Sequence, residues 1–501
     1  MTDINIHEKR DTRFAVTVLT LLVCVGILLR IYHLNSGLWY DEIMTLLGSV
    51  RLPLKEIATR FPSNNTHIFY SALARICITI FGEHVWSFRL PAVIFGVAAI
   101  PMLYLVGKEV TSRFETLLAA SILTVSYHHI WFSQNARGYT ALLFFVLLAT
   151  YLLLSWLRNR SIVKLLAYAV VAALGSYTHL TMVFVIISHA FVCAGFALFQ
   201  GKTSTISKDW KCLAAAFVMS GVLTIGLYAP VMLKVHDFFT NSIPRKLVAT
   251  PRWAFWEALS GLKIGLGTLW IVVFCGGVIC VGFISYFREN RIVPYLFFLP
   301  ALVTLLLAIA MGRPIFPRFF FFLAGFVLLV LVRGAAAIGA WVGERSRDLV
   351  SGPQLSIAAA GILSLSAIVF SVQSLPYGYR YPKQDYQGAV EYVQQNLKDT
   401  EQVAVIGTTA ASPIIEFFGQ PWRRIDCAEE FLELRTEGTN VWLIYTFPLY
   451  IKANQPELWG MIQNECEHIC RFDGTIAGGN IDIFRWSLEK ATNILPLESQ
   501  D

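Results

Sequence analysis

The chain has 501 residues and a formal net charge of +7, and it is 56% hydrophobic but only 15% charged. Soluble domains carry about 25% charged residues, so this composition excludes an ordinary soluble protein and indicates several membrane spans with a smaller soluble part. The positive charge is spread over short loops without a basic run, so we expect no nucleic-acid partner.

The chain begins with a basic cluster before its first apolar stretch. Lys9, Arg10 and Arg13 precede residues 14–32, which are apolar enough to span a membrane. A cleavable signal peptide has the same charge pattern, but no small-x-small cleavage pattern follows this stretch. We therefore expect an uncleaved signal anchor with its N-terminus in the cytoplasm.

Further apolar stretches of about 20 residues, the length that a membrane helix needs, follow along the chain. They are residues 89–107, 115–133, 139–157, 164–180, 181–199, 211–233, 264–287, 292–311, 319–341 and 354–373. The stretch 67–81 is shorter and carries Arg75, so we expect it to lie at the outer interface or to re-enter rather than to cross. With this choice every basic short loop falls on one side, which the positive-inside rule makes cytoplasmic. The sequence thus predicts about eleven crossings of the cytoplasmic membrane, with the C-terminal part outside.

The residues from about 374 onward differ from the apolar part of the chain. Charges and turn residues become frequent, residues 384–398 have the pattern of an amphipathic helix, and three short runs have the pattern of buried strands. These runs are 402–407, 440–446 and 481–486. Alternation of strands and helices predicts a small α/β domain. We expect a membrane domain over residues 1–373 and an extracytoplasmic α/β domain over residues 374–501.

Two adjacent acids, Asp41 and Glu42, follow the first span at the membrane boundary. Carboxylates are costly to desolvate there, which indicates chemistry or ion binding more than packing. Asp41 could accept a proton from a hydroxyl or amine as a general base, and Glu42 could tune it, position the acceptor or share a divalent cation. The alternative is that the two acids begin a helix, and both interpretations are compatible.

Further polar residues lie on the same predicted outer face. His67 begins the segment 67–81 and could bind a cation or a phosphate, or could simply be a polar residue at a helix start. Arg137 and Tyr139 lie at the outer end of a helix hairpin, where arginine suits a bidentate phosphate contact or could snorkel to the interface. Arg313 and Arg318 flank an outer turn against the positive-inside rule, which favours a lipid phosphate, or the anionic headgroups of ordinary membrane lipids, as their partner.

These residues form an ordered set of motifs. The set resembles the GT-C-fold membrane glycosyltransferases, beginning with Leu38-Trp39-Tyr40-Asp41-Glu42 as the first-loop motif. The later landmarks that look similar, in the same order, are Asn65-Thr66-His67, Phe81-Gly82-Glu83, Arg89-Leu90-Pro91, Ser133-Gln134-Asn135-Ala136-Arg137-Gly138-Tyr139 and Pro317-Arg318-Phe319. The resemblance covers most of residues 13–341, and the tail resembles an outer domain that many members carry. It implies a mainly α, GT-C-like polytopic membrane protein, similar to protein mannosyltransferases and the lipid A aminoarabinose transferase.

The family resemblance also implies an activity. It is the inverting transfer of a sugar from a polyprenyl-phosphate donor to an acceptor outside the cytoplasmic membrane, which could be a lipid, a polysaccharide or a protein. Asp41 would be the catalytic base, assisted by Glu42. The donor or acceptor would be bound by His67, Asn135, Arg137, Tyr139, Arg313 and Arg318.

Asn135 is a departure from the family pattern, since many members have an acid at this place. The substitution weakens the case for a metal between the two outer loops, and the nine cysteines show no metal-ligand spacing. Two alternatives stay open: metal-independent catalysis, or a divalent cation near Asp41, Glu42 and His67.

Two other functions compete with the enzyme. A transporter or flippase of lipid-linked sugars would show inverted repeats and charges near the middle of its spans, whereas we find charges only at the edges. A non-catalytic membrane scaffold with a binding tail would not need Asp41.

Overall fold

The computed structural model describes residues 2–62, 66–199, 209–241, 250–345, 352–476 and 478–488. Asn65, which belongs to one of the motifs above, lies outside these residues. The described residues within Met1–Leu34, Leu52–Ser242 and Ala249–Pro376 form one compact unit, and those within Asn35–Arg51 and from Tyr377 onward form a second. The division differs from the one expected at residue 374, because the segment with Asp41 and Glu42 belongs to the second unit.

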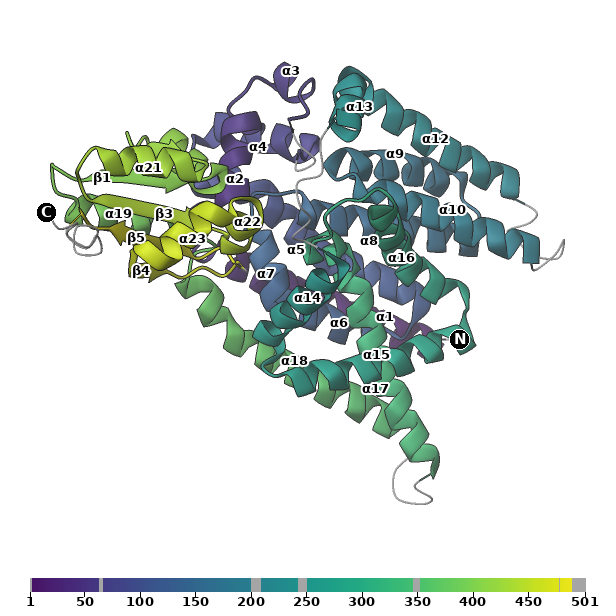
Figure 1. Ribbon diagram of the computed structural model, residues 1–501. Helices are drawn as coiled ribbons and strands as arrows, with labels where there is room; N and C mark the ends of the chain where they lie inside the picture. Colours follow the sequence, from purple (N-terminus) through teal and green to yellow (C-terminus); the bar gives the residue numbers. More distant parts are fainter. Residues whose placement is uncertain are drawn as a thin grey trace, which may run out of the picture. The chain divides into compact units, whose positions relative to one another are not determined.

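The first unit is a bundle of helices (Figure 1). Its elements are α1 (Thr2–Ile31), α3 (Leu54–Ile57), α4 (Ile68–Phe81), α5 (Val85–Val110), α6 (Arg113–Val125), α7 (Tyr127–Ser133), α8 (Tyr139–Asn159), α9 (Ile162–Thr178), α10 (Thr181–Phe199), α12 (Trp210–Tyr228), η2 (Ala229–Val231), α13 (Met232–Asn241), α14 (Pro251–Leu266), α15 (Leu269–Glu289), α16 (Ile292–Ala310), η3 (Pro317–Leu323), α17 (Ala324–Arg345) and α18 (Gly352–Arg380), the last of which continues into the second unit. Helices α5, α8, α9 and α12 pack in succession, and fully buried side chains such as Leu103, Leu143, Phe297 and Phe326 form the core.

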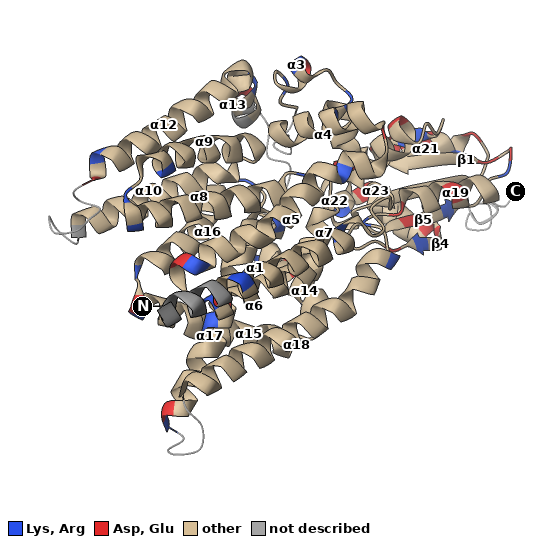
Figure 2. Cartoon of the chain, turned by 180° about the vertical axis from the view of Figure 1, so that it is seen from behind, with Lys and Arg blue, Asp and Glu red and all other residues tan. Residues whose placement is uncertain are grey.

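Nine helices among the described residues are long and apolar enough to cross a membrane. Charged residues are sparse along the bundle and gather mostly near helix ends (Figure 2). The helix α9 is apolar but has 17 residues, and α4 has 14, as expected for a segment too short to span easily. The predicted span 115–133 is not one helix, because the chain leaves the helical conformation at Ser126, with ψ at 120°, between α6 and α7.

Arg30 explains why this break is stable inside the bundle. Its buried guanidinium donates hydrogen bonds to the carbonyl oxygens of Thr124 at 3.0 Å and Leu123 at 3.3 Å, which lie at the end of α6. It also lies 2.6 Å from Nδ1 of His129 on α7. The carbonyls at a helix end have no partner in their own helix, so a buried cation satisfies them and fixes α1 to the break.

Two glycines allow α15 and α17 to cross with their backbones in contact. A Cβ atom on Gly282 would lie 2.0 Å from the carbonyl oxygen of Val330, and one on Gly334 would lie 2.0 Å from that of Val278. No side chain larger than hydrogen fits at either place without separating the helices.

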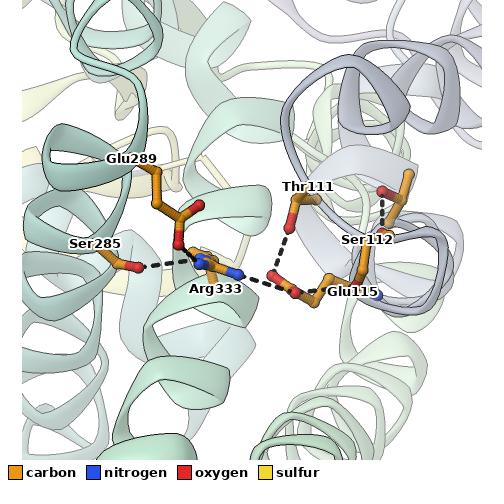
Figure 3. A network of polar contacts seen from close by, with 7 residues as sticks. Thr111, Ser112, Glu115, Ser285, Glu289 and Arg333 are labelled. Carbon is orange, nitrogen blue, oxygen red and sulfur yellow. Dashed lines mark hydrogen bonds and ion pairs between the residues drawn. The ribbon is translucent and has the colours of Figure 1, made fainter. Parts of the chain in front are cut away.

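An arginine on α17 links three helices of the bundle (Figure 3). Arg333 donates to Glu115 of α6 at 3.2 Å and to Ser285 of α15 at 3.0 Å, and it pairs with Glu289. Glu115 also accepts a hydrogen bond from the Thr111 hydroxyl at 2.6 Å. Arg333 lies inside the predicted span 319–341, and its partners Glu115 and Glu289 stand at helix ends, in the first turn of α6 and at the last residue of α15. The charge is tolerated because it is paired.

The second unit contains a five-stranded sheet in the order β2-β1-β3-β5-β4. Its strands are β1 (Gln402–Ile406), β2 (Arg423–Ile425), β3 (Val441–Thr446), β4 (Glu467–Phe472) and β5 (Ile481–Trp486), and its helices are α2 (Tyr40–Thr45), η1 (Leu46–Val50), α19 (Tyr386–Asn396), α20 (Thr408–Ala411), η4 (Ser412–Phe417), α21 (Ala428–Thr436), α22 (Pro448–Asn454) and α23 (Pro456–Glu465). Strand β1 is parallel to β2 and β3, whereas β5 is antiparallel to β3 and β4. Every residue of the central strand β3 is buried, as expected for a strand covered on both faces. The three predicted strands and the predicted helix are confirmed.

Candidate active site

The loop between α7 and α8 in the first unit is fixed to the end of α1. The side-chain amide of Gln134 donates to the carbonyl oxygens of Arg30 at 3.1 Å and Tyr32 at 2.6 Å. Asn135 is fully buried, and its carbonyl oxygen accepts a hydrogen bond from the Arg137 N–H at 2.6 Å. This tight turn holds Arg137, which is 2% exposed, inside the protein.

His67 is joined to this loop by the backbone of Gly138. The Gly138 N–H donates to Nδ1 of His67 at 2.8 Å. A Cβ atom on Gly138 would lie 3.0 Å from the same nitrogen and 3.1 Å from the carbonyl oxygen of Thr178. Glycine is therefore the residue that lets the backbone come close enough for this hydrogen bond.

His179, in the turn between α9 and α10, lies beside His67. The ring centroids are 4.8 Å apart, and the Tyr139 ring lies 5.4 Å from His67 and 5.6 Å from His179. The backbone N–H of Thr181 donates to Nδ1 of His179 at 3.2 Å. In a neutral imidazole whose Nδ1 accepts, the proton is on Nε2, so both histidines present an Nε2–H donor.

Arg137 and Arg318 place positive charge next to both histidines. Burial, together with the charges of Arg137 and Arg318, lowers the pKa of His67 well below 6.5 and that of His179 from 6.5 to about 3. The histidines are therefore neutral donors in a positive field. We call His67, Arg137, Tyr139, His179 and Arg318 the histidine–arginine cluster.

The hydroxyl of Tyr139 is buried without a hydrogen-bond partner among the residues that the structure describes. A buried hydroxyl without a partner is costly, and such a group often serves a ligand. Among the described residues, the charges that shift the pKa of the two histidines come from arginines, or from the other histidine, and not from a carboxylate. Donors and positive charges of this kind suit an anion, and a phosphoryl group fits this chemistry.

Arg313 and Arg318 each lie beside an aromatic ring of the first unit. The Arg313 guanidinium is 5.7 Å from the ring centroid of Phe238 on α13, whereas Arg318 lies over Phe316 at 4.5 Å. The charges that act on His67 and His179 come from Arg137 and Arg318. The predicted binding roles of Asn135 and Arg313 stay predictions.

Asp41 and Glu42 are buried in the first turn of α2, in the second unit. Asp41 is 4% exposed and Glu42 is fully buried. The Glu42 carboxylate accepts a hydrogen bond from the Trp39 N–H at 3.4 Å, and the Thr45 hydroxyl donates to the Asp41 carbonyl oxygen at 2.7 Å. The alternative from the sequence, that the acids begin a helix, therefore describes Glu42 well. Asp41 lies in the same helical turn and is also buried.

A divalent cation near Asp41, Glu42 and His67 is one of the two alternatives that the sequence leaves open. Among the described ranges, no group of three or more His, Cys, Asp and Glu side chains is placed to hold an ion. The carboxylate of Glu42 and Nδ1 of His67 already accept backbone hydrogen bonds. We derive no catalytic step through a metal, and the divalent cation stays a prediction.

The sequence interpretation missed His179. The residue lies between two apolar stretches that follow one another almost without a loop, inside the predicted span 164–180. The available signal was its place at a turn on the predicted outer face, where a polar side chain has no packing reason to occur.

Part of the sequence matches a known protein family and a relative from Bacillus subtilis. Residues 66–228 match the sequence model of the family described as dolichyl-phosphate-mannose-protein mannosyltransferase. "Putative mannosyltransferase YkcB" of Bacillus subtilis (strain 168) is 26% identical over 152 residues, which is 30% of this chain and 20% of that protein. The match thus spans about a fifth of the length of that relative.

Two solved structures resemble almost the whole chain. ArnT from Cupriavidus metallidurans in the apo state has a TM-score of 0.53 at 11% identity, covering 95% of this chain and 98% of ArnT. The oligosaccharyltransferase AglB from Archaeoglobus fulgidus has a TM-score of 0.55 at 14% identity, covering 97% of this chain and 75% of AglB. The chain has the GT-C fold. The predicted fold class, a mainly α GT-C-like multi-pass membrane protein with a small α/β part, is confirmed.

Proposed function

We propose that this GT-C protein is an inverting glycosyltransferase, which moves a sugar from a polyprenyl-phosphate donor to an acceptor outside the cytoplasmic membrane. The histidine–arginine cluster carries the proposal, because it joins two arginine charges and three neutral donors at a buried place suited to a phosphoryl group. Most of the cluster lies within residues 66–228, the range that matches the mannosyltransferase family. AglB, which has a similar fold, was solved in complex with dolichol-phosphate.

In this reaction the acceptor loses a proton to the Asp41 carboxylate, and its oxygen or nitrogen attacks C1 of the sugar from the face opposite the phosphate. The bond between C1 and the phosphate oxygen breaks, and the electron pair stays on that oxygen. A single displacement of this kind inverts the configuration at C1. The phosphate changes from a diester to a monoester and gains negative charge.

Arg137 and Arg318 bind the phosphate and stabilise the charge that it gains. The Nε2–H groups of the two histidines add hydrogen bonds without adding charge. Interactions that strengthen as the bond breaks lower the barrier, whereas those that act equally on the bound donor do not.

The test is sugar transfer by the purified protein in lipid vesicles, with a panel of radiolabelled polyprenyl-phosphate sugars and total membrane acceptors. We expect label in an acceptor with the wild type and none with Asp41→Asn, although the variant inserts normally. Digestion of the labelled product with protease, lipase or glycosidase then assigns the acceptor class. The control is Glu56→Gln, because Glu56 is a half-buried acid of the same predicted outer segment and pairs with Arg60 in the next turn.

Wild-type transfer by Asp41→Asn would refute the proposed mechanism. If no donor gives transfer while the protein is correctly inserted, a flippase of lipid-linked sugars or a non-catalytic scaffold replaces the enzyme as the better interpretation.

A further inference from the structure

The second unit is an open α/β sheet whose connections change direction between β1 and β3. From the carboxyl end of β1 the chain leads to β2 on one side, and from the carboxyl end of β3 it leads to β4 and β5 on the other. Open α/β sheets bind their ligands in the crevice at such a switch point. In this protein, residues of the unit itself occupy that edge.

Gln384 connects the edge of the sheet to the segment that carries the acids. Its Oε1 accepts a hydrogen bond from the Tyr40 N–H at 3.0 Å, and its Nε2 donates to Oγ1 of Thr446, the last residue of β3, at 3.0 Å. Gln384 is 1% exposed and Thr446 is fully buried. The amide oxygen of Gln384 therefore binds the residue before Asp41, and its amide nitrogen binds the sheet.

The glycine-containing connection between β4 and β5 holds Gln384 in place. The Thr475 N–H donates to the carbonyl oxygen of Pro382 at 3.0 Å. A Cβ atom on Gly474 would lie 2.4 Å from the carbonyl oxygen of Lys383. The two backbones thus lie against each other, which restricts movement of the residues directly before Gln384.

The helix α2 has further contacts at the carboxyl end of β1. It packs against η4, and the Arg51 guanidinium lies 6.0 Å from the ring centroid of Phe417 in η4. The Tyr386 hydroxyl donates to the carbonyl oxygen of Thr409 at 2.7 Å. Burial raises the pKa of Tyr386 well above 10, and nearby Tyr40 and Asp41 raise it further, so this ring lies close to the catalytic segment.

We propose that Gln384 is a positioning residue for Asp41, and that the second unit holds α2 at the edge where open α/β sheets hold their ligands. The inference rests on the proposed role of Asp41 as the base. A base must lie within hydrogen-bond distance of the proton that it accepts, so a small displacement of α2 lowers the chemical rate. Donor binding depends on the histidine–arginine cluster and is expected to stay unchanged.

The test uses Gln384→Met, which keeps the length of the side chain and removes its hydrogen bonds, including those to Tyr40 and Thr446, and Thr446→Val, which removes one hydroxyl. Gln387→Met is the matched control, because the exposed Gln387 lies three residues further along the chain, in α19, and its side-chain amide donates to Glu391. The full-length protein in lipid is assayed for kcat and for the donor KM, and hydrogen exchange of residues 38–46 is followed by mass spectrometry.

We expect Gln384→Met to lower kcat about tenfold or more with an unchanged donor KM, since small misplacements of reacting groups cost up to about 100-fold. Hydrogen exchange of residues 38–46 becomes faster in the same variant. Thr446→Val lowers kcat and speeds exchange less strongly, whereas Thr446→Ser, which keeps the hydroxyl, behaves like the wild type.

Wild-type kcat together with wild-type exchange in Gln384→Met would overturn the inference. So would a loss of thermal stability with faster exchange across the whole sheet, because Gln384 would then serve the fold alone. The exchange measurement needs no substrate. If the wild type transfers no sugar, the proposed function fails, while faster exchange of residues 38–46 in Gln384→Met still supports the positioning contact.

Discussion

The backbone N–H of Gly138 donates to Nδ1 of His67 across 2.8 Å, and this bond sets the tautomer of a histidine in the proposed phosphate site. It joins two segments that lie 71 residues apart in the chain. A glycine and a histidine of unrelated motifs therefore act as one structural element.

Gly138→Ala should weaken donor binding, because the added methyl group would lie 3.0 Å from the His67 nitrogen and 3.1 Å from the Thr178 carbonyl oxygen. We expect the donor KM to rise about tenfold, as misplacement of a binding group commonly costs a factor of this order. Gly195→Ala is the control, since a Cβ atom there meets nothing within 4 Å. An unchanged KM in Gly138→Ala would show that the bond is not needed.

His179→Phe and His179→Gln should separate packing from hydrogen bonding. Phenylalanine keeps the ring contacts with His67 and Tyr139, whereas glutamine keeps an N–H near the position of Nε2. A hydrogen bond to a charged group is worth about 1.5–3 kcal/mol, so we expect the phenylalanine variant to raise the donor KM by about 10-fold or more and the glutamine variant to raise it less. Product inhibition by polyprenyl phosphate gives an independent measure. Equal effects of the two variants would contradict a donor role for Nε2.

Acid should destabilise the empty protein through His179. Burial, together with Arg137 and Arg318, lowers its pKa from 6.5 to about 3, so below pH 6.5 the unfolded chain binds the proton more readily than the folded one. The stabilising contribution of His179 is complete above pH 6.5 and is lost as the pH falls towards 3. The fall in Tm between pH 7 and pH 4 should therefore be smaller in His179→Gln than in the wild type. The same substitution at the exposed His236 should leave the fall unchanged.

Gly282→Ala should destabilise the bundle. The added Cβ atom would lie 2.0 Å from a backbone oxygen of α17, which cannot turn aside as a side chain would. We expect a loss of about 1–3 kcal/mol, the usual cost of overpacking, seen as a lower Tm in detergent. Gly277→Ala, on the same helix but with nothing within 4 Å of the new atom, should keep the wild-type Tm. Equal Tm values for the two variants would show that the helices separate without cost.

Local patterns in the sequence predicted the secondary-structure elements whose formation depends on residues close together in the chain. The apolar runs of β1, β3 and β5 and the long membrane helices are properties of single segments, and the structure confirms them. Strand β2 has only three residues, and β4 is exposed or half-buried along its length, so neither has the pattern of a buried strand.

Long-range relationships could not be predicted in the same way. The break at Ser126 is stabilised by Arg30, and the charge of Arg333 is paired with Glu115, which lies 218 residues earlier. His179 and Gln384 belong to no sequence motif, and the role proposed for each depends on a contact with a residue that is far away in the chain. Arg137, Tyr139, His67 and Arg318 belong to the ordered motifs of the sequence, so they could be predicted as site residues without knowledge of the fold.

The membership of residues 35–51 in the second unit has a consequence for engineering. A chimaera could be made by exchanging only the chain after residue 376 between two such proteins. It would combine a foreign sheet edge with the native Tyr40 segment and lose the fit between Gln384 and the Tyr40 backbone. The exchangeable module is discontinuous. It consists of the short segment after the first span together with the C-terminal domain, and graft designs should move both pieces at once.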